Sequence, residues 1–350
     1  LGRAAAHLGT GGVRPAQLRW AALVDEARAA SDEHFGGRHR ARLLHRLLQL
    51  HLFKISPSPM VSLGRGGWLH LYMPAEQACI KRLQPFSWAQ LESWRVGLES
   101  QQAFLAQRGI AFFFLLAPDK HTIYPQTLRP GVLGMAPSRA DQLLAHLAQH
   151  SSVVVIDPRR ALQDAAKRLQ VYHQTDSHWN AAGAFVAYEQ TMQALKQEWP
   201  GLQPLTPDDF ILEHGALHPT DLADMIGLGA VERPTEMRRR GPDAARFDWS
   251  RYAPRRTDLG RLKVAYYESR GHSDAPLGRM VMLGDSFRAN LARFVAEHAS
   301  HGIFVDGYEL DPGLVVRHQP NLVIHQMVER WLHEGSPPPP MEAFGGVVLA

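Results

Sequence analysis

The sequence predicts an α/β fold, a three-layer domain in which helices cover both faces of a central, mostly parallel sheet. Four short apolar runs indicate the strands, because buried parallel strands are continuously hydrophobic. These runs are residues 110–116, 153–156, 280–283 and 322–324. Amphipathic segments of helical length alternate with them. A chain of 350 residues with 45% hydrophobic content is large enough to bury such a core.

The chain divides into three expected parts. Residues 1–60 are predicted to form a helical lead-in, because leucines recur there at the spacing of an amphipathic helix. These leucines are Leu43, Leu44, Leu47, Leu48 and Leu52. The α/β domain is expected over residues 61–335. Residues 336–350 begin with a proline run that should stop the preceding helix and start a tail.

Capping residues locate three helix starts within the domain. Ser87 followed by Gln90 forms a capping box that opens an amphipathic stretch before the first apolar run. Ser138 opens a second helical stretch before the second run, and Asn180 is expected to cap a third helix. The first two helices therefore lead into strands, as an α/β domain requires.

Residues 232–263 interrupt this alternation and are predicted to form a long surface insertion. The segment is rich in arginine, with interspersed proline and glycine. The arginines are Arg233, Arg238, Arg239, Arg240, Arg246, Arg251, Arg255, Arg256 and Arg261. Such a segment could attract a polyanion such as a uronic-acid polysaccharide, and the alternative is a solvated basic loop.

The overall composition excludes some classes of protein. The 38 Lys plus Arg exceed the 34 Asp plus Glu by only four, so the charge predicts no nucleic-acid partner. One cysteine, Cys79, excludes an internal disulfide framework but names no compartment. The sequence has no apolar run of membrane-spanning length, and any N-terminal membrane anchor of the natural protein is expected to lie outside this chain.

Ser286 is the predicted nucleophile. Gly284, Asp285, Ser286 and Phe287 follow the third apolar run directly, which places Ser286 between a parallel strand and a helix. Backbone N–H groups at a helix start can bind a developing oxyanion, and the helix dipole favours negative charge there. The alternative is that Ser286 only caps the helix. The four-residue motif alone does not separate these interpretations.

A second motif provides the base that a serine nucleophile needs. Asp176 and His178 are two residues apart, so the carboxylate can hold one ring nitrogen while the other faces Ser286. Together the three side chains would form a Ser-His-Asp triad. Trp179 follows His178 and could cover the site against water, and the alternative is a core position.

The same segment also allows a metal site, because His173, Asp176 and His178 carry zinc-binding groups. No HExxH helix or other third-ligand signature accompanies them, so no metal and no cofactor is predicted. Among isolated histidines, His121 is expected to be packed or on the surface. His325 lies at the end of a predicted strand, where it could face the cleft.

These motifs resemble the alginate O-acetyltransferase family, of the AlgJ and AlgX type, whose members are SGNH hydrolase-like proteins. The TDSHWN segment is similar to the family's Asp-x-His-Trp signature, and LGDSF is similar to its nucleophile motif. Further similar segments are 35–38, 56–59, 63–69 with Gly67 and Trp68, the Pro118, Lys120, Tyr124 and Pro125 loop, 221–225, and 320–332 with Glu329 and Arg330. Asp176 and His178 precede Ser286, the permuted order that the family shows.

The resemblance implies an SGNH-like acetyltransferase or esterase domain over residues 61–335. It implies transfer of acetyl groups to polysaccharide hydroxyls through an acetyl-serine intermediate, in the periplasm. It also implies a membrane-bound O-acyltransferase partner that supplies the acetyl group, and similarity to members that are tethered to the inner membrane. Lys120 and Tyr124 are expected to line the cleft or to brace its loop.

Two other functions use the same residues. If water and not a sugar attacks the acetyl-serine, the protein is a carbohydrate acetylesterase. A catalytically silent polysaccharide-binding or assembly protein could also retain the fold. The intact trio of Asp176, His178 and Ser286 argues against the silent protein.

Overall fold

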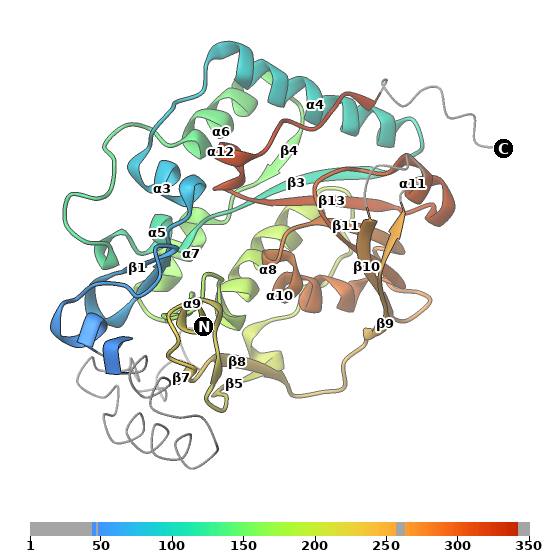
Figure 1. The fold of residues 1–350 in the computed structure, drawn as a ribbon. Coiled ribbons are helices and arrows are strands. Elements are labelled where there is room, and N and C mark those ends of the chain that lie inside the picture. The colour runs from blue at the N-terminus through green and yellow to red at the C-terminus, as the bar shows by residue number, and fades with distance from the viewer. Residues whose placement is uncertain (1–43, 47, 257–262, 342–350) are drawn as a thin grey trace.

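The computed structural model describes residues 44–46, 48–256 and 263–341, and Figure 1 shows their arrangement. The α-helices are α3 (Pro74–Lys81), α4 (Trp88–Ala106), α5 (Lys120–Ile123), α6 (Arg139–His150), α7 (Arg159–Ala166), α8 (Ala181–Leu195), α9 (Asp221–Met225), α10 (Phe287–Val295), α11 (Pro312–His318) and α12 (Trp331–Glu334). Shorter helical turns are η3 (Leu48–Leu52), η4 (Arg65–Gly67), η5 (Pro125–Thr127), η6 (Pro207–Asp209) and η7 (Ala296–His298).

The strands form one large sheet and three small ones. The large sheet contains β3 (Ala111–Ala117), β4 (Val154–Ile156), β9 (Arg246–Arg256), β10 (Lys263–Arg270), β11 (Arg279–Gly284), β12 (His301–Asp306) and β13 (Leu322–Val328). The small antiparallel pairs are β1 (Val61–Leu63) with β2 (Leu69–Leu71), β5 (Phe210–His214) with β8 (Thr235–Arg239), and β6 (His218–Pro219) with β7 (Ala230–Glu232).

The central sheet confirms the predicted fold class. Its order is β4-β3-β13-β11-β12-β10-β9. The strands from β4 to β12 are parallel to their neighbours, and β10 is antiparallel to both β12 and β9. The predicted apolar runs are β3, β4, β11 and β13. Because parallel strands share a direction, the carboxyl ends of β3, β11 and β13 meet at one edge of the sheet.

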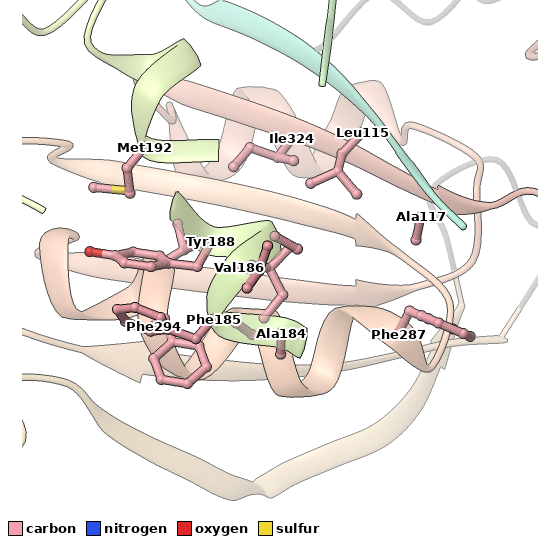
Figure 2. Packing of buried hydrophobic residues seen from close by; sticks show 14 of the residues in the cluster. Leu115, Ala117, Ala184, Phe185, Val186, Tyr188, Met192, Phe287, Phe294 and Ile324 are labelled. Carbon is pink, nitrogen blue, oxygen red and sulfur yellow. The ribbon is translucent and has the colours of Figure 1, made fainter. Parts of the chain in front are cut away.

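Alternate residues of each strand point to opposite faces, and each face has its own core. From β3, Phe113 and Leu115 pack with α8 and α10, whereas Phe112 and Phe114 pack with α4 and α6. Figure 1 shows these helix pairs on opposite sides of the sheet, and Figure 2 shows Phe185 of α8 packed in the first core. The three-layer arrangement follows from this double burial.

The predicted helix starts are confirmed at three positions. Ser87 and Ser138 each form a capping box, with Gln90 and Asp141 as the reciprocal partners. The Asn180 side chain accepts a hydrogen bond from the Gly183 amide at the start of α8. Side-chain caps satisfy amide groups that a helix start otherwise leaves without partners.

The described part of residues 232–263, predicted to form a long surface insertion, consists mostly of strands. Glu232 ends β7 and is buried, β8 and β9 continue the segment as strands, and Lys263 begins β10. The arginines obscured an apolar component. The ring of Phe247 in β9 lies 6.0 Å from Tyr267 and 5.7 Å from Phe304, so it packs along the sheet. β9 and β10 therefore extend the central sheet as an antiparallel edge.

The two ends of the chain are described only in part. Most of the predicted helical lead-in, including Leu43 and Leu47, lies outside the described residues, as do Arg261 and residues 342–350. The described proline run packs closely on α4, because a Cβ at Gly97 would lie 2.1 Å from the Pro338 carbonyl oxygen. Within the described residues, no helix combines the length and apolar character needed to cross a membrane.

Candidate active site

Ser286 lies between the carboxyl end of β11 and the start of α10, as the sequence predicts. Its side chain is exposed, and its Oγ lies 2.6 Å from His178 Nε2. The Ser286 side chain does not cap α10. The hydroxyl is therefore free to donate to the imidazole.

The neighbouring Asp285 holds the turn that presents Ser286. Its Oδ1 accepts hydrogen bonds from the Phe287 amide at 2.9 Å and from Gln326 Nε2 at 3.0 Å. Its Oδ2 accepts from the Tyr308 hydroxyl at 2.8 Å and from the Val328 amide at 2.7 Å. Asp285 thus takes the capping role that the alternative interpretation gave to Ser286, and it ties the turn to β13.

Gly284 allows β13 to approach this turn. A Cβ at this position would lie 2.3 Å from Gln326 Oε1 and 2.7 Å from the Gln326 carbonyl oxygen. Any larger side chain would displace Gln326, which also accepts a hydrogen bond from the Asp285 amide. The glycine of the motif is thus required by close packing.

His178 and Asp176 meet Ser286 from the loop that precedes α8. His178 Nδ1 lies 2.7 Å from Asp176 Oδ1, and its Nε2 faces the serine. The His178 amide also donates to Asp176 Oδ1 at 3.0 Å. The structure therefore brings together three side chains that are far apart in the sequence, in the order carboxylate, imidazole, hydroxyl.

Asp176 stays ionised in this setting. Burial by itself raises the pKa of the carboxyl, but hydrogen bonds and charge attraction from His178 oppose it, together with the amide of Asp221. The net result is a pKa well below the ordinary value for aspartate. An ionised carboxylate at Nδ1 fixes the ring tautomer that leaves Nε2 able to accept the serine proton.

Asp221, at the start of α9, is a second carboxylate near the imidazole. Its Oδ2 lies 3.8 Å from His178 Nδ1 and accepts a hydrogen bond from the Ser177 hydroxyl, and its Oδ1 accepts from the Ser177 amide at 2.8 Å. No motif assigned a role to Asp221, although it lies in a segment similar to one in the alginate O-acetyltransferase family. Its contact with the loop at Ser177 depends on the tertiary fold.

The start of α10 offers one free amide for an oxyanion. The Phe287 amide donates to Asp285 Oδ1, and the Arg288 amide donates to the Asp285 carbonyl oxygen. Within the described residues, the Ser286 amide has no hydrogen-bond partner. A carbonyl oxygen attacked by Ser286 Oγ would therefore find this N–H group available.

The four residues expected to contact the substrate are buried. Trp179 Nε1 donates to the Phe287 carbonyl oxygen at 3.1 Å, and the Tyr124 hydroxyl accepts from the Val171 amide at 2.9 Å. His325 has 0% exposure, and its Nδ1 lies 3.0 Å from Gln101 Oε1 on α4. Burial lowers the pKa of His325 to about 3, so its ring is neutral.

The expectation that His325 faces the cleft is therefore corrected. The residue lies in β13, but its side chain points to the face that α4 covers, where the Phe114 ring is 5.6 Å away. Trp179 packs against Phe287, next to Ser286, and Tyr124 packs against Tyr172 and Trp68. A substrate cannot touch these side chains without rearrangement of the core.

Lys120, the fourth of these residues, fastens the catalytic loop. Its Nζ donates to the carbonyl oxygens of His173 at 3.1 Å, Gln174 at 3.2 Å and Asp176 at 2.7 Å. Burial lowers the pKa of Lys120 to about 8, although Glu232, Asp176 and Asp221 oppose this shift. Of the two roles that the sequence left open for Lys120, the contacts favour bracing the loop.

Replacing Lys120 with methionine is expected to destabilise the protein by about 2 kcal/mol or more, since three loop carbonyls lose a donor in the interior. Turnover of an acetyl ester should fall as well, because the loop carries Asp176. Thermal unfolding and steady-state kinetics measure both effects. Lys167→Met is the matched control, since the Lys167 side chain is 73% exposed. Equal effects of the two substitutions would contradict the bracing role.

Glu232 supports the same loop through three further hydrogen bonds. Its carboxylate accepts hydrogen bonds from the amides of Gln174 at 2.8 Å and Thr175 at 2.7 Å, and from the Thr175 hydroxyl at 2.6 Å. Burial raises the pKa of Glu232. His173 and these donors lower it by more, so the net pKa is below the ordinary value for glutamate. No motif pointed to Glu232, because it lies in the segment that the sequence assigned to a surface insertion.

The structure changes the metal hypothesis. Asp176, His178 and Asp221 place donor atoms within 4.8 Å of one another, whereas His173 instead faces Glu232 at 3.6 Å. Both ring nitrogens of His178 already face partners, Asp176 and Ser286. A metal ion would have to displace one of these contacts, so the hydrogen-bonded trio is the simpler account of the site.

A protein family and several solved structures are similar to this chain. The family model for an SGNH hydrolase-like domain, acetyltransferase AlgX, matches residues 61–294. No curated protein matches the chain. Among solved structures, PatB1 of Bacillus cereus with a sulfonyl adduct is similar at a TM-score of 0.58 and 15% identity, covering 76% of this chain and 93% of that one.

Two further structures share the fold. The O-acetyltransferase domain of Pseudomonas putida AlgJ has a TM-score of 0.50 and 20% identity, covering 78% of this chain and 92% of that one. A DHHW family protein from Eubacterium siraeum has a TM-score of 0.53 and 13% identity, covering 78% and 95%. At these identities the likeness establishes the fold.

Proposed function

The chain belongs to the AlgX acetyltransferase family of SGNH hydrolase-like domains, and from this premise we propose that it transfers acetyl groups to hydroxyls of an exported polysaccharide. One observation carries the proposal. The Asp176 carboxylate, the His178 imidazole and the Ser286 hydroxyl form a continuous hydrogen-bonded chain, with distances of 2.7 Å and 2.6 Å. This is the arrangement that activates a serine for acyl transfer.

In the first half of the proposed reaction, Ser286 Oγ attacks the carbonyl carbon of an acetyl donor. His178 Nε2 takes the serine proton as the new bond forms, and Asp176 stabilises the resulting imidazolium. The Ser286 amide donates to the tetrahedral oxyanion. When the carbon–oxygen bond to the leaving group breaks, His178 returns the proton to that group, and Ser286 carries the acetyl ester.

In the second half, a polysaccharide hydroxyl attacks the acetyl-serine. His178 removes the hydroxyl proton, the oxyanion forms again, and the proton returns to Ser286 Oγ as the ester bond to serine breaks. The net reaction moves one acetyl group from donor to sugar. The exposed position of Ser286 supports this step, because a large polymer can reach it.

The family supports finer assignments, which belong to the same proposal. The acceptor is an alginate-like polysaccharide, and the protein works in the periplasm. The acetyl donor comes from a membrane-bound O-acyltransferase partner, and a tether holds the protein at the inner membrane. Co-purification of such an acyltransferase with the full-length protein would support this assignment.

An esterase is the second candidate, because water reaches an exposed Ser286 as easily as a sugar does. Incubation with nitrophenyl acetate and alginate separates the two. An acetyltransferase yields acetyl esters on the polymer, detected by NMR, and an esterase yields only free acetate. A protein that gives neither product and forms no acetyl-serine would be a silent binding protein.

A further inference from the structure

A row of basic residues crosses four neighbouring strands of the central sheet. In the strand register, Arg279 of β11 is paired with His301 of β12, and His301 is paired with Arg270 of β10. Arg270 is in turn paired with Arg246 of β9. We call these four residues the basic ladder. β9 and β10 form the edge of the sheet at the right of Figure 1.

The register places the ladder on one face of the sheet, since directly paired residues point to the same side. Neighbouring strands are about 4.8 Å apart, so the ladder spans about 14 Å across the sheet. Three of its members, Arg270, Arg279 and His301, line an open pocket of about 530 Å³. Arginines spaced regularly across the sheet suit a ligand with regularly spaced negative charges.

The end of α11 adds further basic groups to this pocket. Arg317 and His318 line it as well, and the His318 ring lies 6.2 Å from the His301 ring. Burial first, and then the positive charges of His301 and Arg317, lower the pKa of His318. Burial is the largest cause, and the neighbouring positive charges act in the same direction, against Glu268.

The buried carboxylate of Glu268 contacts the ladder. Glu268 is buried, and its Oε2 lies 3.2 Å from His301 Nε2 and 3.8 Å from an Arg270 guanidinium nitrogen. The pocket itself carries the arginines Arg270, Arg279 and Arg317. Like charges directly opposite each other also destabilise a strand pair, as at Arg246 and Arg270. An anion bound in the pocket would be attracted by Arg270, Arg279 and Arg317, which line it.

We propose that the basic ladder, together with Arg317 and His318, binds the carboxylates of an acidic polysaccharide. The choice of this polymer class rests on the proposed function. The site differs from the catalytic one, because Arg279 begins β11 and Gly284 ends it next to Ser286. The two ends of this strand are separated by about 17 Å at 3.3 Å per residue. A polymer held at the ladder would raise the local concentration of hydroxyls near Ser286.

The test measures binding of alginate oligosaccharides by isothermal titration calorimetry, with neutral dextran oligosaccharides of matched length for comparison. The protein with the unchanged ladder and the ladder variant both carry Ser286→Ala, so that acetyl chemistry plays no part. The variant Arg246→Gln/Arg270→Gln should bind alginate at least tenfold more weakly. Added salt should weaken binding to the unchanged ladder, since exposed charges are screened. The control Arg160→Gln/Arg168→Gln removes two exposed arginines of α7 and its flank and should leave the affinity unchanged.

A second measurement separates the ladder from the chemistry. With Ser286 restored, the ladder variant should turn over nitrophenyl acetate within twofold of the unchanged protein. Equal alginate affinity of the ladder variant and the unchanged protein would overturn the proposal, as would equal binding of dextran. Capture by anionic phospholipid vesicles without binding of alginate would also overturn it. Failure of the proposed function appears elsewhere, as a Ser286→Ala protein that still turns over the ester.

Discussion

Replacing Ser286 with alanine is expected to lower the turnover of an acetyl ester by about 10³-fold or more, since the members of a catalytic triad act as a unit. Removal of Oγ leaves His178 without a nucleophile to activate, and the covalent route is lost. Thermal stability should change little, because the exposed hydroxyl bonds only to His178 among the described residues. Steady-state kinetics with nitrophenyl acetate measure the loss, and circular dichroism checks the fold.

The matched control is Ser93→Ala. Ser93 is exposed on α4, and its hydroxyl donates to the Ala89 carbonyl oxygen at 2.9 Å. Its removal should leave turnover unchanged. Full turnover by Ser286→Ala would reject the nucleophile and, with it, both the transferase and the esterase.

The second large effect is expected from Asp176→Asn. In the native protein, Asp176 Oδ1 accepts from the backbone amide and the ring of His178, and its Oδ2 accepts from the Asp221 amide. An asparagine side chain has only one oxygen and cannot replace both acceptors. It also lacks the charge that stabilises imidazolium and fixes its tautomer. Turnover should fall by about 10³-fold to 10⁴-fold, the scale of such substitutions in other triads. The measurement is again the turnover rate. The control is Asp164→Asn, which changes an exposed side chain of α7.

The variant Asp221→Asn tests which of the two carboxylates orients the His178 ring. Asp221 Oδ2 is 3.8 Å from His178 Nδ1, against 2.7 Å for Asp176 Oδ1. The loss should therefore be clearly smaller than for Asp176→Asn. If Asp221→Asn costs as much or more, then Asp221 is the carboxylate that orients the imidazole.

The sequence was sufficient for the parts of the fold that depend on local pattern. Continuous apolar runs identified β3, β4, β11 and β13, and capping residues located the starts of α4, α6 and α8. The pattern failed over residues 232–263, because the many arginines of the segment obscured the aromatic Phe247. Phe247 packs on Tyr267 and Phe304, and neither contact is visible along the chain.

The candidate site also contains residues that the sequence predicted and residues that only the fold reveals. Ser286, His178 and Asp176 were found because each motif is short and its chemistry is specific. Glu232 and Asp221 hold the catalytic loop through contacts with residues 44 to 58 positions away. The sequence identified Lys120 but did not predict that it is buried. A lysine that donates to three carbonyl oxygens has no sequence feature that distinguishes it from a surface lysine.

The most direct test of the account is the intact mass of the protein after brief incubation with nitrophenyl acetate and an acid quench, followed by peptide mapping. The account predicts one acetyl group on Ser286, which disappears when a polysaccharide acceptor is added and never forms in Ser286→Ala. Continued turnover with no acetyl group on Ser286 at any time point would contradict it.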